Sequence, residues 1–310
     1  MGKLAFIFSG QGAQYVGMGK QIAEGYKSAA DVFDQATEAL GFDIRRMIFD
    51  SDDETLKITE NTQPSIVTMS IACLQPLLEK GLKPDFVAGL SLGEYSAHVC
   101  SGTLSFMDAV ALVRKRGKFM QEAVPVGIGA MAAILGLDSA VVLECCREGS
   151  GSGIVETVNF NCPGQIVVAG EVKAVEKVIE LCKERGAKRS MLLPVSAPFH
   201  CSLLKPAGDK LAVELEKIQL GEIKIPVVTN VTAEVITDAK KVKDLLIRQV
   251  SNPVRWEDSV NTMLESGVDT FVEIGPGKTL SGFVKKINKD VRTFNIEDIE
   301  SLNRTLSEID

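Results

Sequence analysis

The sequence predicts an α/β protein in which a smaller unit interrupts a parallel sheet. Apolar runs of strand length alternate with helical segments, as in sheets with parallel strands. Residues 86–99, FVAGLSLGEYSAHV, place Gly-x-Ser-x-Gly between an apolar run and a helical segment, which is the layout of a nucleophile elbow. Residues 130–195 follow the order β-α-β-β-α-β, typical of a ferredoxin-like unit. We therefore expect an α/β-hydrolase-like core with a parallel sheet and an inserted ferredoxin-like (βαββαβ) subdomain.

The elements of the core follow one another along the chain. The apolar run Leu4–Phe8 is too short for a signal peptide and is interpreted as the first buried strand. Residues 63–80 predict a long buried helix, residues 86–90 a strand before the elbow, and residues 107–120 a further helix. Later we expect strands at residues 225–229 and 270–274 and helices near residues 242–250 and 256–265.

The inserted unit has its own sequence of elements. We expect strands at residues 131–135, 154–160, 165–169 and 189–195, and helices at residues 139–148 and 172–185. The run Gly149–Gly153 is expected to be a turn or short flexible loop. The predicted large subdomain comprises residues 1–125 and 198–310, and the small one residues 126–197. The cleft between them is the expected ligand site.

Composition excludes several classes of protein. The 310 residues include 45% hydrophobic residues, enough for a substantial core. Lys+Arg 34 against Asp+Glu 41 gives a net charge of -7, which argues against nucleic acid or an anionic membrane as the main partner. No apolar run reaches membrane-spanning length. The seven cysteines form no disulfide framework, so we expect reduced thiols in a cytoplasmic protein.

Ser91 is the candidate nucleophile. Gly89 and Gly93 lack a Cβ, so the strand and helix backbones on either side of the serine can approach closely. Leu92 and Gly93 fall in the first helical turn, where unpaired N–H groups and the helix dipole stabilise an oxyanion. A serine hydroxyl also needs a base, usually a histidine.

The chain contains two histidines. His98 lies seven residues beyond Ser91 on one helix, about 10 Å along its axis, and is interpreted as structural. His200 lies where the inserted unit returns to the main sheet and is the candidate base, with a packed or surface-loop role as the alternative. Cys201 is an alternative nucleophile, but Ser91 has the better setting.

Arg116 indicates the class of substrate. On a helical wheel it falls in the middle of an apolar stripe that contains Leu112, Val113, Phe119 and Met120. An inward guanidinium must meet an anion, because it cannot be neutralised. The anion is either an internal Asp or Glu or a substrate carboxylate, which a guanidinium binds through two parallel hydrogen bonds.

Several ordered motifs resemble the family of malonyl-CoA:acyl carrier protein transacylases, the acyltransferases of bacterial type II fatty acid synthesis, nearly end to end. The matching stretches are Gly10-Gln11-Gly12-Ala13-Gln14, Thr62-Gln63-Pro64, Ser91-Leu92-Gly93-Glu94, Arg114-Lys115-Arg116-Gly117, Asn159-Phe160-Asn161-Cys162-Pro163-Gly164-Gln165, Ala197-Pro198-Phe199-His200, Asn252-Pro253-Val254 and Gly275-Pro276-Gly277-Lys278. This chain departs from the family at Leu90, where a histidine is usual. Phe199 resembles the malonyl-selecting version of its loop, where a bulky ring crowds an α-methyl group.

The resemblance implies roles for particular residues. Ser91 would be the acylated nucleophile and His200 its general base, and Arg116 would hold the malonyl carboxylate. The other implied site residues are Gln11 and Leu92, whose backbone N–H groups would form the oxyanion hole, Gln249, whose backbone carbonyl would orient His200, and Gln63 and Asn161, which would line the substrate path.

The resemblance also implies a reaction. The chain is expected to transfer malonyl from malonyl-CoA to the phosphopantetheine thiol of acyl carrier protein, through malonyl-Ser91 and a ping-pong mechanism, for fatty acid biosynthesis. It implies no metal and no cofactor of the enzyme itself, and we expect a monomer. An acidic carrier would bind a local basic patch. Candidates for that patch are Arg114, Lys115, Lys118, Lys188, Arg189, Lys285 and Lys286.

Three alternatives remain open. A stand-alone acyltransferase of a polyketide synthase or malonate decarboxylase system would have nearly the same sequence pattern. A thioesterase- or lipase-like serine hydrolase shares the elbow chemistry but does not need an inward arginine. A non-catalytic carrier-binding protein would have no use for the elbow, the base or the arginine.

Overall fold

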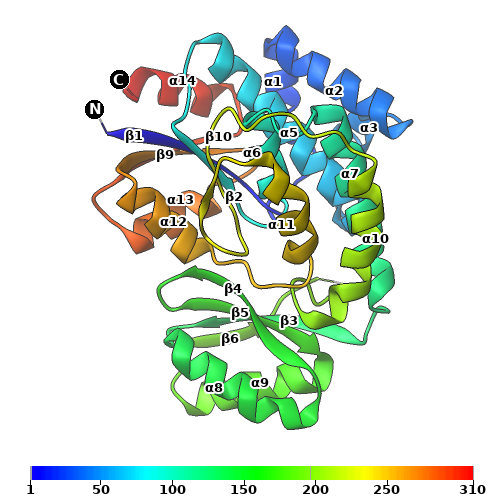
Figure 1. The fold of residues 1–310 in the computed structure, drawn as a ribbon, viewed down its shortest axis with the longest axis vertical. Coiled ribbons are helices and arrows are strands. Elements are labelled where there is room, and N and C mark those ends of the chain that lie inside the picture. The colour runs from blue at the N-terminus through cyan, green and yellow to red at the C-terminus, as the bar shows by residue number, and fades with distance from the viewer. Residues whose placement is uncertain (1, 196, 310) are drawn as a thin grey trace.

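The computed structural model describes residues 2–195 and 197–309, within which the strands form a six-stranded and a four-stranded sheet (Figure 1). The larger sheet has the order β10-β9-β1-β2-β7-β8. Its strands are β1 (Lys3–Phe8), β2 (Phe86–Gly89), β7 (Val227–Val228), β8 (Val235–Ile236), β9 (Val268–Ile274) and β10 (Arg292–Ile296). All neighbours pair in parallel except β7 and β8, which are antiparallel. The predicted α/β fold with a parallel sheet is confirmed, whereas β8 and β10 were not predicted.

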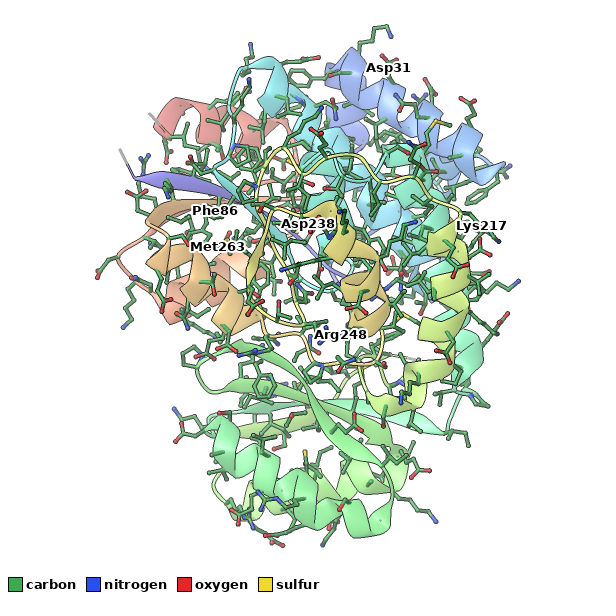
Figure 2. The ribbon with its side chains drawn as sticks, in the orientation of Figure 1. Asp31, Phe86, Lys217, Asp238, Arg248 and Met263 are labelled. Carbon is green, nitrogen blue, oxygen red and sulfur yellow. The ribbon has the colours of Figure 1, made fainter. Side chains whose placement is uncertain are left out.

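Helices bury both faces of the larger sheet. Alternate residues of β1 enter different apolar clusters: Phe6 and Phe8 pack in one, and Ala5 and Ile7 in the other. Burial on both faces explains why this strand is a continuous apolar run. Figure 2 labels Phe86 and Met263, two members of the second cluster. The helices of this unit are α1 (Lys20–Gly25), α2 (Lys27–Leu40), α3 (Ile44–Phe49), α4 (Asp53–Lys57), α5 (Thr59–Glu79), α6 (Gly93–Cys100), α7 (Phe106–Ala123), α10 (Lys205–Glu216), α11 (Val242–Gln249), α12 (Trp256–Glu265), α13 (Thr279–Ile287) and α14 (Ile299–Glu308).

The smaller sheet lies at one end of the molecule, with its two helices on the face away from the larger sheet (Figure 1). Its order is β4-β5-β3-β6, and every neighbouring pair is antiparallel. The elements are β3 (Gly129–Leu135), α8 (Ser139–Gly149), β4 (Val155–Cys162), β5 (Gln165–Glu171), α9 (Val172–Glu184) and β6 (Arg189–Leu192). The predicted order of strands and helices is therefore present. Residue 196, inside the predicted small subdomain, lies outside the described residues.

One local prediction in this unit needs correction: β6 ends at Leu192, before the predicted residue 195, and Pro194 has no N–H to continue the ladder. The Gly149–Gly153 run contains the turn that was one of its two predicted alternatives, because Gly149 ends α8 and residues 150–152 form a 3-10 turn. A Cβ at Gly149 would lie 2.6 Å from the Val178 side chain, so close packing against α9 explains that glycine.

Backbone hydrogen bonds join the two units. The N–H of Phe160 in β4 donates to the carbonyl of Val254 at 3.0 Å, and the N–H of Val254 donates to the carbonyl of Val158 at 2.8 Å. Figure 2 places Arg248, at the end of α11, close to this boundary. Within the described residues, no helix combines the length and the apolar character needed to cross a bilayer.

Candidate active site

The turn after β2 brings three backbone segments into close contact. A Cβ at Gly89 would lie 2.0 Å from the carbonyl carbon of Gly93, and a Cβ at Gly93 would lie 2.1 Å from the carbonyl oxygen of Phe8. Ser91 between them has a φ of 53°, in the left-handed region that side chains rarely adopt. These contacts explain both glycines of the predicted elbow. Leu90, at the position where the family usually has a histidine, is half-buried against the second apolar cluster.

Asn230 holds the backbone of this turn. Its Oδ1 accepts a hydrogen bond from the N–H of Ser91 at 2.6 Å, and its Nδ2 donates to the carbonyl of Gly89 at 2.7 Å. The residue is fully buried just after β7. Asn230 was not predicted as a site residue from the sequence. A polar residue that follows a buried parallel strand was the available signal, because ligand sites lie at the carboxyl ends of such strands.

His200 lies beside the serine hydroxyl. Its Nε2 is 2.6 Å from Oγ of Ser91, and its Nδ1 is 2.7 Å from the carbonyl oxygen of Gln249. A carbonyl only accepts hydrogen bonds, so the ring proton sits on Nδ1 and the lone pair of Nε2 faces the hydroxyl. His200 itself has a φ of 64°, which shows that the surrounding structure fixes an unfavourable backbone conformation.

Burial lowers the pKa of His200 to about 3. The lowered pKa also includes a smaller effect of the nearby charge of Arg116 in the same direction and an opposing effect of the hydrogen bond to Gln249. The imidazole is therefore neutral near pH 7, the state in which Nε2 can accept a proton.

Arg116 is inside the protein, as its place on the helical wheel predicted, with 2% of its surface exposed. Its guanidinium donates to Oε1 of Gln63 at 3.0 Å, to Oε1 of Gln249 at 3.0 Å, and weakly to Oγ of Ser91 at 3.4 Å. Among the described residues, no Asp or Glu lies within ion-pair distance of it. Of the two predicted alternatives, the direct internal ion pair is absent from this part of the chain. The N–H donors of the guanidinium next to Ser91 are therefore not occupied by a carboxylate of this part of the chain.

Two backbone N–H groups next to the serine are available as donors. Among the described residues, neither the N–H of Gln11 nor that of Leu92 donates a hydrogen bond. The Gln11 loop is held close to the elbow, since a Cβ at Gly10 would lie 2.5 Å from the carbonyl oxygen of Leu90. The Gln11 side chain lies 3.5 Å from Nε2 of Gln63.

The structure brings most of the predicted residues together. Ser91, His200, Arg116, Gln63 and Gln249 form one hydrogen-bonded group, and Gln11 joins it through Gln63.

Asn161 does not join this group: its buried Oδ1 has no partner among the described residues. His98 is fully buried in α6, and its ring nitrogens form no hydrogen bond with described residues. Cys201 donates from Sγ to the carbonyl of Pro198 at 3.0 Å, and burial raises the pKa of its thiol to about 12. In the described part of the chain all seven cysteines are free.

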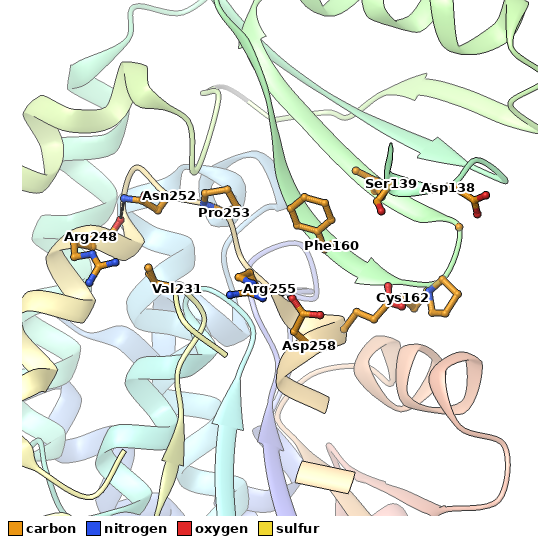
Figure 3. A pocket seen from close by; sticks show the side chains of 14 residues that line it. Asp138, Ser139, Phe160, Cys162, Val231, Arg248, Asn252, Pro253, Arg255 and Asp258 are labelled. Atoms are coloured by element: carbon orange, nitrogen blue, oxygen red, sulfur yellow. Dashed lines mark hydrogen bonds and ion pairs between the residues drawn. The ribbon is translucent and has the colours of Figure 1, made fainter. Parts of the chain in front are cut away.

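A cavity of about 650 Å³ lies between the two units (Figure 3). Figure 3 shows Phe160 and Cys162 of the small unit on one side, and Arg248 and Arg255 of the large unit on the other. The lining contains none of the reactive residues described above. Asn161, between Phe160 and Cys162, is not among the residues that line this cavity. The expected space between the units is thus present, but the serine lies outside its lining.

Comparisons with known proteins agree on one family. Residues 5–303 match the acyl transferase domain family. The malonyl CoA-acyl carrier protein transacylase of Bacillus subtilis is 49% identical over 303 residues, which cover 97% of this chain and 96% of the relative. The enzyme of that name from Escherichia coli K12 is 49% identical over 288 residues, 93% of each chain.

Solved structures give the same result. The crystal structure of malonyl CoA-acyl carrier protein transacylase from Clostridium perfringens has a TM-score of 0.96 and 50% identity, covering 99% of this chain and 97% of that one. A malonyl-transacylase in complex with a type II polyketide synthase acyl-carrier protein has a TM-score of 0.96 and 43% identity, covering 98% and 99%. The chain therefore belongs to the acyl transferase domain family, among the malonyl CoA-acyl carrier protein transacylases.

Proposed function

We propose that this chain transfers the malonyl group of malonyl-CoA to the phosphopantetheine thiol of an acyl carrier protein, for fatty acid biosynthesis. The observation that carries the proposal is the contact of three groups: Oγ of Ser91 lies 2.6 Å from Nε2 of His200 and 3.4 Å from Nη2 of Arg116. A nucleophile, a base and a cation for a carboxylate are thereby combined in one buried site. The names of the relatives describe the same reaction.

In the first half-reaction, Oγ of Ser91 attacks the thioester carbonyl while Nε2 of His200 takes the hydroxyl proton. The N–H groups of Gln11 and Leu92 stabilise the oxyanion. Collapse of the tetrahedral intermediate breaks the carbon–sulfur bond, and His200 returns the proton to the CoA thiolate.

In the second half-reaction, the carrier thiol gives its proton to His200 and attacks the malonyl ester of Ser91. Collapse of this intermediate returns the proton to the serine oxygen. Arg116 holds the malonyl carboxylate through both halves with its unoccupied donors. These steps use side chains and backbone groups only, so the proposed reaction needs no metal and no cofactor beyond the two thiol carriers. Gln63 and Asn161 line the path of the substrate in this proposal.

Phe199 sets the preference for malonyl over methylmalonyl. Its ring is 8% exposed and directly precedes His200. An α-methyl group on the acyl chain would have to fit beside this ring, and close-packed sites tolerate added volume poorly.

The carrier docks on a basic edge formed by Lys188, Arg189 and Lys286. Arg189 pairs with Leu135 in the small sheet, Leu135 pairs with Gln165, and Nζ of Lys286 reaches Oε1 of Gln165 at 3.1 Å. The three basic side chains, all exposed, thus follow one end of the sheet from the small unit to α13. Charge attraction to an acidic carrier acts at such a surface.

The other basic candidates have charged, aromatic or backbone partners within the chain, whereas Lys286 donates to the neutral side chain of Gln165. Nζ of Lys115 donates to Glu214 at 2.7 Å, and Arg114 lies over the ring of Phe42 at 4.3 Å. Lys118 lies 3.9 Å from Glu122, and Lys285 donates to backbone carbonyls. These residues are less available to a carrier.

We interpret the fold as an α/β-hydrolase-like core with a ferredoxin-like subdomain. The parallel sheet with the serine directly after β2 supports the first part, and the antiparallel order β4-β5-β3-β6 with α8 and α9 on one face supports the second. The boundaries remain residues 1–125 and 198–310 for the core and 126–197 for the subdomain. Seven free thiols are consistent with a cytoplasmic location, and a monomer remains our expectation.

A second candidate function is transfer of malonyl to a polyketide carrier. The solved relative that is bound to a type II polyketide synthase carrier favours it. The active-site chemistry is the same, so only the identity of the carrier distinguishes the two functions.

Intact-protein mass spectrometry tests the proposal. The protein is mixed briefly with malonyl-CoA, with acetyl-CoA as control, and a fatty acid or polyketide carrier protein is then added. We expect one malonyl adduct on Ser91 that persists in water and moves to the carrier. Free malonate without an adduct would instead indicate a hydrolase, and no reaction at all would contradict both enzyme functions.

A further inference from the structure

Glu94 is a fully buried carboxylate in the first turn of α6. Its Oε2 accepts hydrogen bonds from the backbone N–H of Asn230 at 3.0 Å and from Nε2 of Gln249 at 2.8 Å. Among the described residues, its Oε1 has no hydrogen-bond partner, and the one group at ion-pair distance is the His98 ring, at 3.9 Å. Burying a carboxylate costs free energy unless hydrogen bonds offset the cost, so this residue next to the elbow requires an explanation.

The Gln249 side chain connects Glu94 to Arg116. Its Oε1 accepts from Nη2 of Arg116 at 3.0 Å, while its Nε2 donates to Glu94 and to the carbonyl of Ser91, the latter at 2.9 Å. A guanidinium has only donors and a carboxylate only acceptors, so one orientation of the amide satisfies both. Reversing the amide would place its NH₂ group against the guanidinium. Glu94 and the Ser91 carbonyl, which both accept from Nε2, therefore fix which end of Gln249 faces Arg116.

This arrangement leaves the guanidinium without a carboxylate partner among the described residues, although it donates to the side chains of Gln63, Gln249 and Ser91. A carboxylate in direct contact with Arg116 would occupy the donors that a substrate carboxylate needs. Glu94 lies one amide further away, where its negative charge still compensates the buried positive charge. Nε of Arg116 forms no hydrogen bond with a described residue, and the ring of Tyr95 lies 5.4 Å from the guanidinium carbon, so the hydrogen bonds to Gln63, Gln249 and Ser91 leave donors of the guanidinium unused.

We infer that Glu94 is a positioning residue for the recognition of carboxylated acyl groups, acting on Arg116 through the Gln249 amide. The inference rests on the proposed function, because it assumes that Arg116 binds the malonyl carboxylate. The second hydrogen bond of Glu94, to Asn230, reaches the residue that holds the Ser91 backbone. One buried carboxylate thus supports both the arginine and the turn of the nucleophile.

The test measures the ratio of Ser91 acylation by malonyl-CoA to acylation by acetyl-CoA. Glu94→Met keeps the length of the side chain but removes the acceptor, whereas Glu94→Gln keeps an acceptor oxygen. Gln249→Met removes the amide but keeps the backbone carbonyl that faces His200. Ser96→Ala is the matched control: Ser96 is also buried in α6, and its hydroxyl has no partner among the described residues.

We expect Glu94→Met and Gln249→Met each to lower the ratio roughly tenfold, the effect of one lost hydrogen bond to a charged group. Glu94→Gln should restore most of the ratio, and Ser96→Ala should leave it unchanged. In the double variant, Glu94→Met should add little to Gln249→Met, because both break the same connection. If Glu94→Met does not fold, the ratio of Gln249→Met still tests the connection.

Four outcomes would overturn the inference. The first two are a Glu94→Met ratio equal to that of the unmodified protein and a Glu94→Gln ratio as low as that of Glu94→Met. The third is a double variant in which the effects of the two substitutions on the ratio add. The fourth is a Gln249→Met ratio equal to that of the unmodified protein. Failure of the proposed function has a different signature, because the unmodified protein would then form no malonyl adduct.

Discussion

Nε2 of His200 lies 2.6 Å from Oγ of Ser91, although 109 residues separate the two in the chain. Hydrogen bonds position both residues of this contact. Asn230 accepts from the backbone N–H of Ser91, and the Gln249 carbonyl accepts from Nδ1 of His200. A backbone carbonyl orients this imidazole, so the arrangement needs no buried acid in contact with the ring. The side chain of Gln249 also accepts a hydrogen bond from Arg116. One residue therefore contacts both the base, His200, and the cation, Arg116.

Replacing Ser91 by alanine should abolish the covalent intermediate. The neighbouring thiol cannot substitute, because burial raises the pKa of Cys201 to about 12 and its Sγ is bonded to the Pro198 carbonyl. Intact-protein mass spectrometry after mixing with malonyl-CoA measures the adduct. Cys201→Ser is the matched control and should acylate like the unmodified protein; a malonyl adduct on Ser91→Ala would show that the nucleophile lies elsewhere.

Replacing Arg116 by alanine should remove the preference for malonyl over acetyl thioesters by roughly 100-fold, because two charge-assisted hydrogen bonds to the carboxylate are lost. Acylation of Ser91 by acetyl-CoA should persist. Arg114→Ala, which removes a cation stacked on Phe42 on the same helix, should change the preference little. Equal loss with both thioesters would mean that Arg116 has a structural role only.

The activity should show no loss near pH 6.5. With a pKa of about 3, His200 stays neutral across pH 5–8, so the rate of Ser91 acylation should be nearly constant as pH falls through 6.5. Rapid quenching at each pH, followed by mass spectrometry, measures this rate. A decline with a midpoint near 6.5 would show that the imidazole titrates as an exposed histidine does.

Stability should also depend on this histidine. The pKa of His200 falls from 6.5 when unfolded to about 3 when folded, so the unfolded state binds the proton first as pH decreases. The contribution of the neutral His200 ring to the free energy of unfolding is complete above pH 6.5. It is lost as pH falls toward 3, by about 1 kcal/mol per pH unit. Urea unfolding between pH 4.5 and 7.5 should therefore give a steeper decline than the same measurement on His200→Gln; equal slopes would contradict the burial of a neutral ring.

Two glycine substitutions should have opposite effects on the free energy of unfolding. Gly93→Ala places a Cβ 2.1 Å from the Phe8 carbonyl oxygen and should cost about 3 kcal/mol or more. Gly282→Ala, in the exposed interior of α13 with nothing within 4 Å of the new Cβ, should gain roughly 0.5–1 kcal/mol. Thermal and urea unfolding measure both. A stable, fully active Gly93→Ala would show that the elbow is less tightly packed than described.

Features with local causes could be predicted from the amino-acid sequence. The two glycines around Ser91 lie within five residues of each other. Helical periodicity was enough to predict that Arg116 points inward. Long apolar runs identified β1, β2 and β9 because burial on both faces leaves a strong pattern. The two-residue β8 and the partly exposed β10 leave no such pattern, which is why they were not predicted.

Which side chains meet in the site depends on tertiary packing. The partners of the site are far apart in the chain: Ser91 and Asn230 are separated by 139 residues, and Glu94 and Gln249 by 155. Hydrogen bonds at 2.6–3.0 Å depend on how strands and helices pack, and no local pattern encodes that packing. The sequence itself supplied His200 as the candidate base, and the resemblance supplied Gln249 and Gln11. The Glu94, Gln249 and Asn230 network became apparent only from the folded chain, because each of its bonds joins separate elements.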